Sequence, residues 1–364
     1  MKIVMKLKNF VWILLLVSFC QKHNEEVIHL SNEVFNIDNG TFSTRKIKDI
    51  PIEYKIPKIV VKSKDFEDYN IIDPRFVKYN VKNGKVYIAD SGNCSIVVLD
   101  SLLNYIDIFG EFGQGPGEFR NPRGISFIHN DDIVISDWGN QRIQFYTKDF
   151  KFLSQISVEE YWSMPQYVQV DSKGNLYFKL FYKDSLIVVL DRVGGILKKF
   201  GKLFELEEIY SDEPSFRYFE SEFHYNIDNH NNIYCAFINR PILRKYDENF
   251  QLVFEVNYSS LPIVQLRLQE WIELVKAKNN KKVYISKNYT RFLSVDEKNI
   301  YVQFISKKSF PVYVFNKENG EIEKCIYFKD NTGKNTIYEC LDCTSKNYIY
   351  AINRINKTIA VFNK

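Results

Sequence analysis

The chain has 364 residues, of which 45% are hydrophobic and 26% charged, a composition that excludes disordered, collagen-like and fibrous proteins. It contains 29 Phe and 24 Tyr but only 3 Met, which favours pleated, half-buried surfaces over helices. The formal charge is +4, but three lysines lie in the N-terminal leader described next. The remainder is close to neutral and has no general nucleic-acid footprint.

The first twenty residues have the features of an export signal. Three lysines precede an apolar run at 10–19, which is too short to span a bilayer but suits a signal peptide. Cys20 follows that run at once and resembles the lipidated cysteine of bacterial lipoproteins, which becomes the new N-terminus. An ordinary secretory leader or an uncleaved anchor is the alternative. We therefore expect three segments: a signal peptide at 1–20, a polar tether at 21–40 and a single domain at 41–364.

One sequence unit occurs six times in the rest of the chain. Each copy has a short strand with Tyr or Val near its start, a turn, and a second strand of alternating apolar residues. The aligned positions are Tyr87, Val134, Tyr177, Tyr234, Tyr301 and Tyr350. Spacings of roughly 45 residues, two of them stretched by insertions, are typical of a four-stranded propeller blade. The sequence thus predicts an all-β, six-bladed propeller with antiparallel blades, and a β-sandwich would not explain six copies in phase.

The last unit ends after its third strand, so its blade lacks an outer strand. Residues 51–62 precede the first unit and alternate like a strand. We predict that this N-terminal segment completes the last blade and closes the ring, leaving no open edge between first and last blades.

An inserted helix is predicted near 262–278, between the fourth and fifth units. Val264, Leu268, Trp271, Ile272 and Val275 fall on one helical face. This face must pack either on the propeller or on a partner.

Residues 109–146 resemble an NHL repeat. The resemblance rests on the Gly115–Phe119 loop, Pro122, Asp137, Gly139-Asn140 and Arg142. We expect structural roles for them: a positive φ at Gly139-Asn140 in the hairpin and pairing of Arg142 with Asp137 or a neighbouring blade. The whole chain, leader included, is similar to the exported six-bladed propeller lipoproteins of the Bacteroidetes. That resemblance implies a lipid-anchored protein of the outer membrane, with no assigned chemistry.

A ligand is expected on the face that bears the connections between second and third strands, because those connections carry cations in five of six blades. The predicted site residues are Trp138, Arg142, Tyr182, Lys183, Arg240, Lys307, Lys308 and Arg354, with His224 and Glu222 near the channel mouth. Such a surface suits an anion: an acidic glycan, a peptide carboxylate or a lipid head group. Alternatively these charges are merely solvated, and the Glu-rich insertion at 202–222 could neutralise them.

Catalytic signatures are missing from the sequence. Only His224 of the five histidines is expected near the channel, so a three-histidine zinc site is excluded. Cys340 and Cys343 are expected to point to opposite faces of a strand. With Cys94, Cys235 and Cys325 they could form at most two disulfides. No metal site or cofactor is predicted, although oxygen ligands for calcium leave no fixed spacing.

The leading hypothesis is a non-catalytic binding or scaffold module, anchored through Cys20 at the cell envelope as a monomeric propeller. Its partner would be an envelope protein or an anionic small ligand or glycan, and not nucleic acid. The alternative is a calcium-dependent, lactonase-like hydrolase or lyase with its site at the channel mouth.

Overall fold

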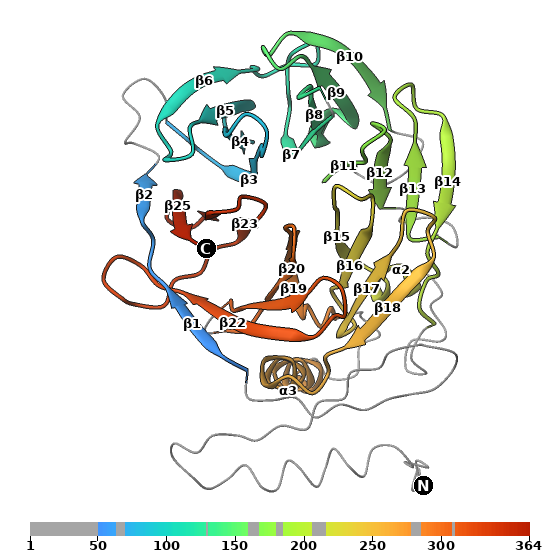
Figure 1. Cartoon of the computed structure of the whole chain (residues 1–364), viewed down its shortest axis with the longest axis vertical. Coiled ribbons are helices and arrows are strands. Elements are labelled where there is room, and N and C mark those ends of the chain that lie inside the picture. The colour runs from blue at the N-terminus through green and yellow to red at the C-terminus, as the bar shows by residue number, and fades with distance from the viewer. Residues whose placement is uncertain are drawn as a thin grey trace, which may run out of the picture.

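Six sheets, each built on four antiparallel strands, surround a central axis, and the first strand of each blade lies nearest that axis (Figure 1). The computed structural model describes residues 50–62, 70–128, 130–158, 167–179, 185–205, 216–277, 285–307 and 310–364. This arrangement confirms the predicted six-bladed propeller.

The strands of each blade follow one another in chain order from axis to rim. Blade one has β3 (Pro74–Tyr79), β4 (Val86–Asp90), β5 (Ser95–Leu99) and β6 (Tyr105–Phe109). Blade two has β7 (Pro122–Phe127), β8 (Ile133–Asp137), β9 (Arg142–Tyr146) and β10 (Phe152–Ser157). Blade three has β11 (Gln169–Val170), β12 (Leu176–Lys179), β13 (Ile187–Leu190) and β14 (Ile196–Phe200).

The second half of the ring repeats this order. Blade four has β15 (Phe223–Ile227), β16 (Ile233–Phe237), β17 (Ile242–Tyr246) and β18 (Leu252–Asn257). Blade five has β19 (Thr290–Val295), β20 (Asn299–Phe304), β21 (Val312–Asn316) and β22 (Ile322–Phe328). Blade six has β23 (Cys340–Asp342), β24 (Tyr348–Asn353) and β25 (Thr358–Asn363).

The N-terminal strand β2 (Ile59–Lys62) is the outer strand of blade six. It pairs antiparallel with β25, and Val60 lies opposite Ala360. The ring is therefore closed by the two ends of the domain, as predicted. The prediction was wrong for β1 (Ile52–Lys55), which pairs parallel with β22 of blade five. The chain crosses between these rims at Pro57, which lacks the N–H that a continuing ladder would require.

Burial explains why the middle strands are so apolar. Every residue of β4, β5, β8 and β9 is buried, because neighbouring blades cover both faces of each sheet. The outer strands β6 and β14 are largely exposed. Short continuous apolar runs are the sequence pattern of such doubly covered strands.

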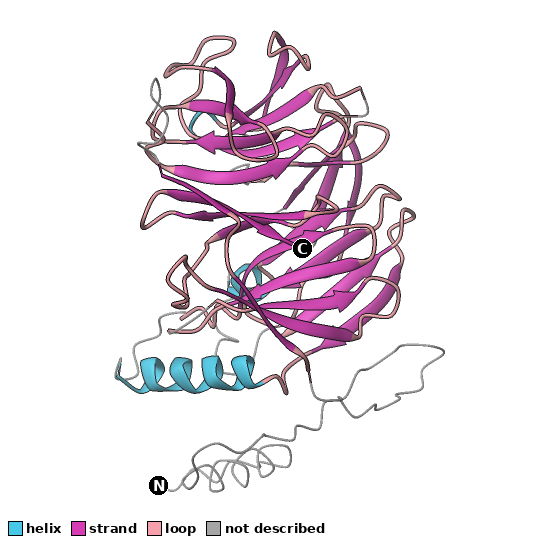
Figure 2. Ribbon diagram, turned by 60° about the vertical axis from the view of Figure 1, so that its left-hand side comes forward, coloured by secondary structure: helices cyan, strands magenta, loops and turns pink. Residues whose placement is uncertain are grey.

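The inserted helix α3 (Pro262–Ala277) confirms the predicted element, and Figure 2 shows it lying along one side of the propeller. Val264 packs into an apolar cluster with Tyr258 and Phe304, so the helix covers the propeller itself. Its buried face is shifted from the predicted one, since Ile263 is buried and Ile272 is 37% exposed. No helix in the described ranges has both the length and the apolar composition needed to cross a bilayer.

The aligned tyrosines anchor the turns between first and second strands. Three of them donate a hydrogen bond to an aspartate in the preceding turn: Tyr177 to Asp171 (3.2 Å), Tyr234 to Asp228 (3.0 Å) and Tyr301 to Asp296 (2.9 Å). The other oxygen of Asp228 accepts the backbone amides of His230 and Asn232, as in an Asx turn. Local geometry and burial therefore select the same residue types in successive blades.

Two of these aspartates also join neighbouring blades. Lys317, which follows β21 of blade five, places Nζ 2.8 Å from Asp228 of blade four, and both side chains are almost fully buried. Lys364 of blade six pairs in the same way with Asp296 of blade five. Burial alone would raise the pKa of Asp228, but Lys317 and Asn232 outweigh it and lower that pKa. These ion pairs fix one blade against the next.

We predict that Lys317→Met destabilises the protein by about 3 kcal/mol, because it leaves Asp228 buried without its cation. The matched control is Lys324→Met, whose partner Glu53 is 37% exposed, and its cost should stay below about 1 kcal/mol. Equilibrium urea unfolding at pH 7 measures both values. A lowered aspartate pKa contributes stability above the unfolded value near pH 4, and this contribution is lost as pH falls through the folded pKa. The difference between wild type and Lys317→Met should therefore shrink below pH 4, and equal costs for both variants at pH 7 would contradict the assignment.

Candidate functional site

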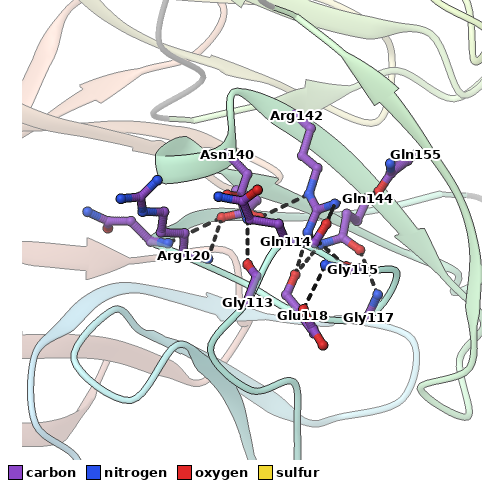
Figure 3. Close-up of polar contacts among 12 residues, drawn as sticks. Gly113, Gln114, Gly115, Gly117, Glu118, Arg120, Asn140, Arg142, Gln144 and Gln155 are labelled. Carbon is purple, nitrogen blue, oxygen red and sulfur yellow. Dashed lines mark hydrogen bonds and ion pairs between the residues drawn. The ribbon is translucent and has the colours of Figure 1, made fainter.

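Blade two uses its polar residues to hold a loop (Figure 3). Asp137 is fully buried and accepts the backbone amides of Arg120 (3.0 Å) and Asn121 (3.2 Å). The Arg142 guanidinium pairs with Asp137 at 3.1 Å. It also donates to the side chain of Gln155 and to the carbonyl oxygens of Gln114, Gly115 and Glu118. These contacts use the guanidinium of Arg142 to hold the loop, so Arg142 is not part of the candidate ligand site.

The hairpin after β8 has a different geometry from the one expected. The residue with positive φ is Gln141 (50°), not Gly139. Glycine is required at 139 for space, because a Cβ there would lie 2.9 Å from Cβ of Arg120. The expectation was wrong because glycine is favoured both where backbone segments approach closely and where φ is positive. The sequence alone does not tell these two causes apart.

The other predicted cations lie in different surroundings. Arg240 is paired with the buried Glu220 at 2.8 Å, so the insertion before β15 does neutralise it. Lys307 is 60% exposed and lies 4.0 Å from Glu273 of α3. Glu222 lies 3.8 Å from Lys179. Tyr182, Lys183 and Lys308 lie outside the described residues.

Arg354 and His224 come together at one mouth of the central channel. They line a cup of about 250 Å³, which we call the channel-mouth cup. Its charged and polar lining is Arg75, Arg123, Tyr167, His224, Asn288, Thr290, Arg291, Glu339 and Arg354. Trp138 lies beside it, with the Arg123 guanidinium 4.0 Å from the centre of its ring. Four arginines from blades one, two, five and six thus face one concave space.

Three of these arginines are positioned by irregularities at the start of the innermost strands. The pairing register shifts between Pro74 and Phe76 in β3, between Pro122 and Gly124 in β7, and between Thr290 and Phe292 in β19. The residue skipped in each ladder is Arg75, Arg123 and Arg291, respectively. A β-bulge re-aims a side chain, and bulges are common next to functional sites. Here the same device is used in three blades to direct a guanidinium to the axis.

The cup has an excess of positive charge. Arg75 and Arg354 share Asp73, at 2.6 and 3.3 Å, and Arg291 pairs with Glu339 at 3.0 Å. Four arginines with two acids leave a surplus of two charges among these residues. Burial, and then repulsion from Arg75, lowers the pKa of Arg123, although an arginine stays protonated at any physiological pH. A bound anion would relieve this repulsion.

Polar atoms that lack a hydrogen-bond partner gather at the same place. Among the described residues, buried unpartnered atoms include Arg354 Nε, Glu339 Oε2, His224 Nε2 and Trp138 Nε1. Burial and the neighbouring Lys179 lower the pKa of His224 to about 3, so its imidazole is neutral at pH 7. Unsatisfied buried polar atoms are costly. Their concentration here indicates a binding surface that a ligand or solvent completes.

The sequence did not reveal Arg75, Arg123, Tyr167, Arg291 or Glu339 as site residues. One available signal was the arginine that directly follows a strand-opening proline at Pro74 and Pro122. Alternation along a strand predicts which side chains share a face, but a bulge inverts that prediction for the residue it contains. The arginines that line the cup could therefore be identified only from the tertiary structure.

The five described cysteines are all buried and free. Burial raises the pKa of the Cys340 thiol to about 12 and also raises that of Cys343. These two side chains belong to different apolar clusters, in agreement with the expectation that they point to opposite faces.

The fold and the cup define a six-bladed propeller with a basic channel mouth. Residues 67–352 match the family model described as "6-bladed beta-propeller". This match covers well over half of the chain, and the protein therefore belongs to that six-bladed β-propeller family.

Two solved structures show the same fold, and a third is similar at a TM-score below 0.5 and carries no argument about this chain. A protein from Bacteroides fragilis that is described as exported has a TM-score of 0.55 and 14% identity, covering 86% of this chain and 98% of its own. The structure of U3-55K has a TM-score of 0.51 and 8% identity, covering 85% and 100%. Virginiamycin B lyase from Staphylococcus aureus has a TM-score of 0.48 and 13% identity, covering 80% of each chain. At these identities the likeness shows the fold alone.

Two curated proteins match shorter stretches of sequence. The chain is 26% identical over 137 residues to "Protein brain tumor" of Drosophila melanogaster, covering 37% of this chain and 13% of that protein. It is 43% identical over 47 residues to "B-box type zinc finger protein ncl-1" of Caenorhabditis elegans, covering 13% and 6%. The chain thus spans a small part of either relative.

We predict that Arg142→Ala destabilises the protein by about 3 kcal/mol, because Asp137 and several loop carbonyls then lose a buried donor. Arg120→Ala is the matched control, since that side chain is exposed and only its backbone amide bonds to Asp137. Its cost should be within about 0.5 kcal/mol. Urea unfolding of both variants measures the difference. A neutral Arg142→Ala would show that the loop is held by other contacts.

Proposed function

We propose that this protein is an exported, lipid-anchored binding module of the cell envelope that takes an anionic ligand in the channel-mouth cup. The observation that carries the proposal is the convergence of four arginines, three of them on β-bulges, in one concave space. Guanidinium groups form strong, charge-assisted pairs with oxyanions. The ligand would enter from the open face, because the channel narrows below the cup.

The channel narrows beneath the cup. Tyr167 and Phe292 line both the cup and the space beneath it, and the rings of Phe76 and Tyr167 are 5.2 Å apart. The space below measures about 20 Å³, room for about one water molecule. A small molecule or the end of a chain fits this shape, and a strand threaded through the propeller does not.

The charge of the cup favours binding over calcium-dependent catalysis. Calcium takes six to eight oxygen ligands, mostly carboxylates and carbonyls. The charged lining of the cup offers one carboxylate, Glu339, among four guanidinium groups, and their field repels a divalent cation. A non-catalytic role as a binding or scaffold module therefore accounts best for the residues at the mouth.

Export and anchoring through Cys20 remain part of the proposal, supported by the leader sequence. The fold similarity to a Bacteroides fragilis protein described as exported agrees with it. An anchored propeller would present its cup to an envelope glycan, a small anion or a chain end on a partner protein.

The anion site is tested by calorimetric titration of the full-length protein in detergent with citrate. Arg123→Gln and Arg354→Gln should each weaken citrate binding roughly tenfold, because each removes a charge-assisted hydrogen bond. Arg192→Gln, in an exposed turn between β13 and β14 on the opposite side of the propeller, is the matched control and should bind like wild type. Equal losses in all three variants would indicate non-specific charge attraction. If citrate gives no heat of binding with the wild type, the proposed anion site is refuted.

Lipidation is tested separately by labelling cells that express the protein with radioactive palmitate. The wild type should be labelled and should fractionate with membranes, whereas Cys20→Ser should lose the label. Cys94→Ser, a buried cysteine of blade one, should keep it. Retention of label by Cys20→Ser would refute the anchor without affecting the anion site.

A further inference from the structure

The channel-mouth cup contains an unsatisfied acceptor as well as cations. Glu339 accepts a hydrogen bond from Arg291 through Oε1 at 3.0 Å, while its buried Oε2 has no partner among the described residues. The side chain of Glu339 is only 15% exposed. A ligand that satisfies Oε2 must bring a donor, such as a hydroxyl or an N–H group. A second anionic oxygen at that position would be repelled.

Two further polar atoms of the cup have no hydrogen-bond partner among the described residues. Nε of Arg354 is a donor, and Nε2 of the neutral His224 serves as donor or acceptor according to its tautomer. An anionic group near Arg123 and Arg354, with several hydroxyl-like groups around that anion, would therefore complete the hydrogen bonding of the cup. A phosphate or sulfate ester oxygen cluster supplies charge but no donor at pH 7.

The cup also has an apolar part. Tyr167, Phe292, Ile238 and Ile305 line it together with the charged groups. Pyranose rings present a flat C–H face that packs well on aromatic side chains, through their apolar area. Because the channel narrows to about 20 Å³ beside Phe76 and Tyr167, a terminal or free ring fits against these side chains better than a ring within a continuing chain.

We propose that the channel-mouth cup binds the carboxylate-bearing ring of an acidic sugar, a uronic acid that is free or at the end of a glycan. This inference rests on the proposed function and specifies its ligand. The planar carboxylate matches the forked donors of Arg123 and Arg354. The ring hydroxyls donate to Glu339 and bond to His224, and the ring face lies on Tyr167. A peptide carboxylate offers a single neighbouring N–H for these partners and satisfies the cup less completely.

The experiment is a calorimetric titration of the full-length protein in detergent with five probes. They are glucuronic acid, its neutral methyl ester, glucose 6-phosphate, N-acetylalanine and tri-galacturonic acid. Glucuronic acid should bind at least tenfold more tightly than the ester, the phosphate and N-acetylalanine. If tri-galacturonic acid binds more tightly than glucuronic acid, the bound uronic acid is the end of a glycan. If glucuronic acid binds more tightly, the ligand is a free sugar acid.

Glu339→Gln gives a signature that a purely structural residue would not give. It should weaken glucuronic acid roughly tenfold, since a charged acceptor is lost, and should strengthen glucose 6-phosphate by removing repulsion. Glu323→Gln on the exposed side of β22 is the matched control and should change neither. If Glu339→Gln fails to fold, the comparison of the five probes on the wild type still tests the acidic-sugar proposal.

The two proposals fail in different ways. If glucose 6-phosphate or N-acetylalanine binds as tightly as glucuronic acid, the acidic-sugar inference is overturned while the anion site stands. If citrate and all five probes fail to bind, both proposals are overturned.

Discussion

Closure of the ring is the constraint on which the rest of this structure depends. A four-stranded blade is stable only when both faces of its middle strands are covered, and each blade obtains that cover from its two neighbours. Blade six would lack its outer strand without β2 (Ile59–Lys62), which comes from the other end of the domain. The chain ends are thereby paired, and the middle strands of the ring are mostly buried between sheets.

Closure also decides where charge can gather. The innermost strands run in the same direction around the axis, so their starting residues meet at one mouth of the channel. Arg75, Arg123 and Arg291 occupy bulges at those starts, and Arg354 reaches the same space from a hairpin of blade six. Residues up to 279 positions apart in the chain thus become neighbours, which is a consequence of the six-fold arrangement and not of any local motif.

Stability and binding use arginine in opposite ways in this molecule. Arg142 is buried and satisfied by Asp137 and three loop carbonyls, so it holds one blade connection in place. Arg354 has a buried nitrogen without a partner among the described residues. A satisfied buried cation stabilises a fold, whereas an incompletely satisfied one at a concave surface is a cost that a ligand can remove. This contrast separates Arg142 of blade two from the arginines of the cup.

The sequence by itself determined the number of blades, the order of their strands, the inserted helix and the role of β2, because the apolar pattern of a strand repeats with each blade. It also pointed to His224 near the channel mouth and to Arg354 on the face that bears the connections between second and third strands. It could not separate Arg142 and Arg240, whose charges are neutralised by Asp137 and Glu220, from cations that remain available. Only the tertiary structure placed Arg75, Arg123 and Arg291 together, because a β-bulge reverses the direction that simple alternation assigns to a side chain.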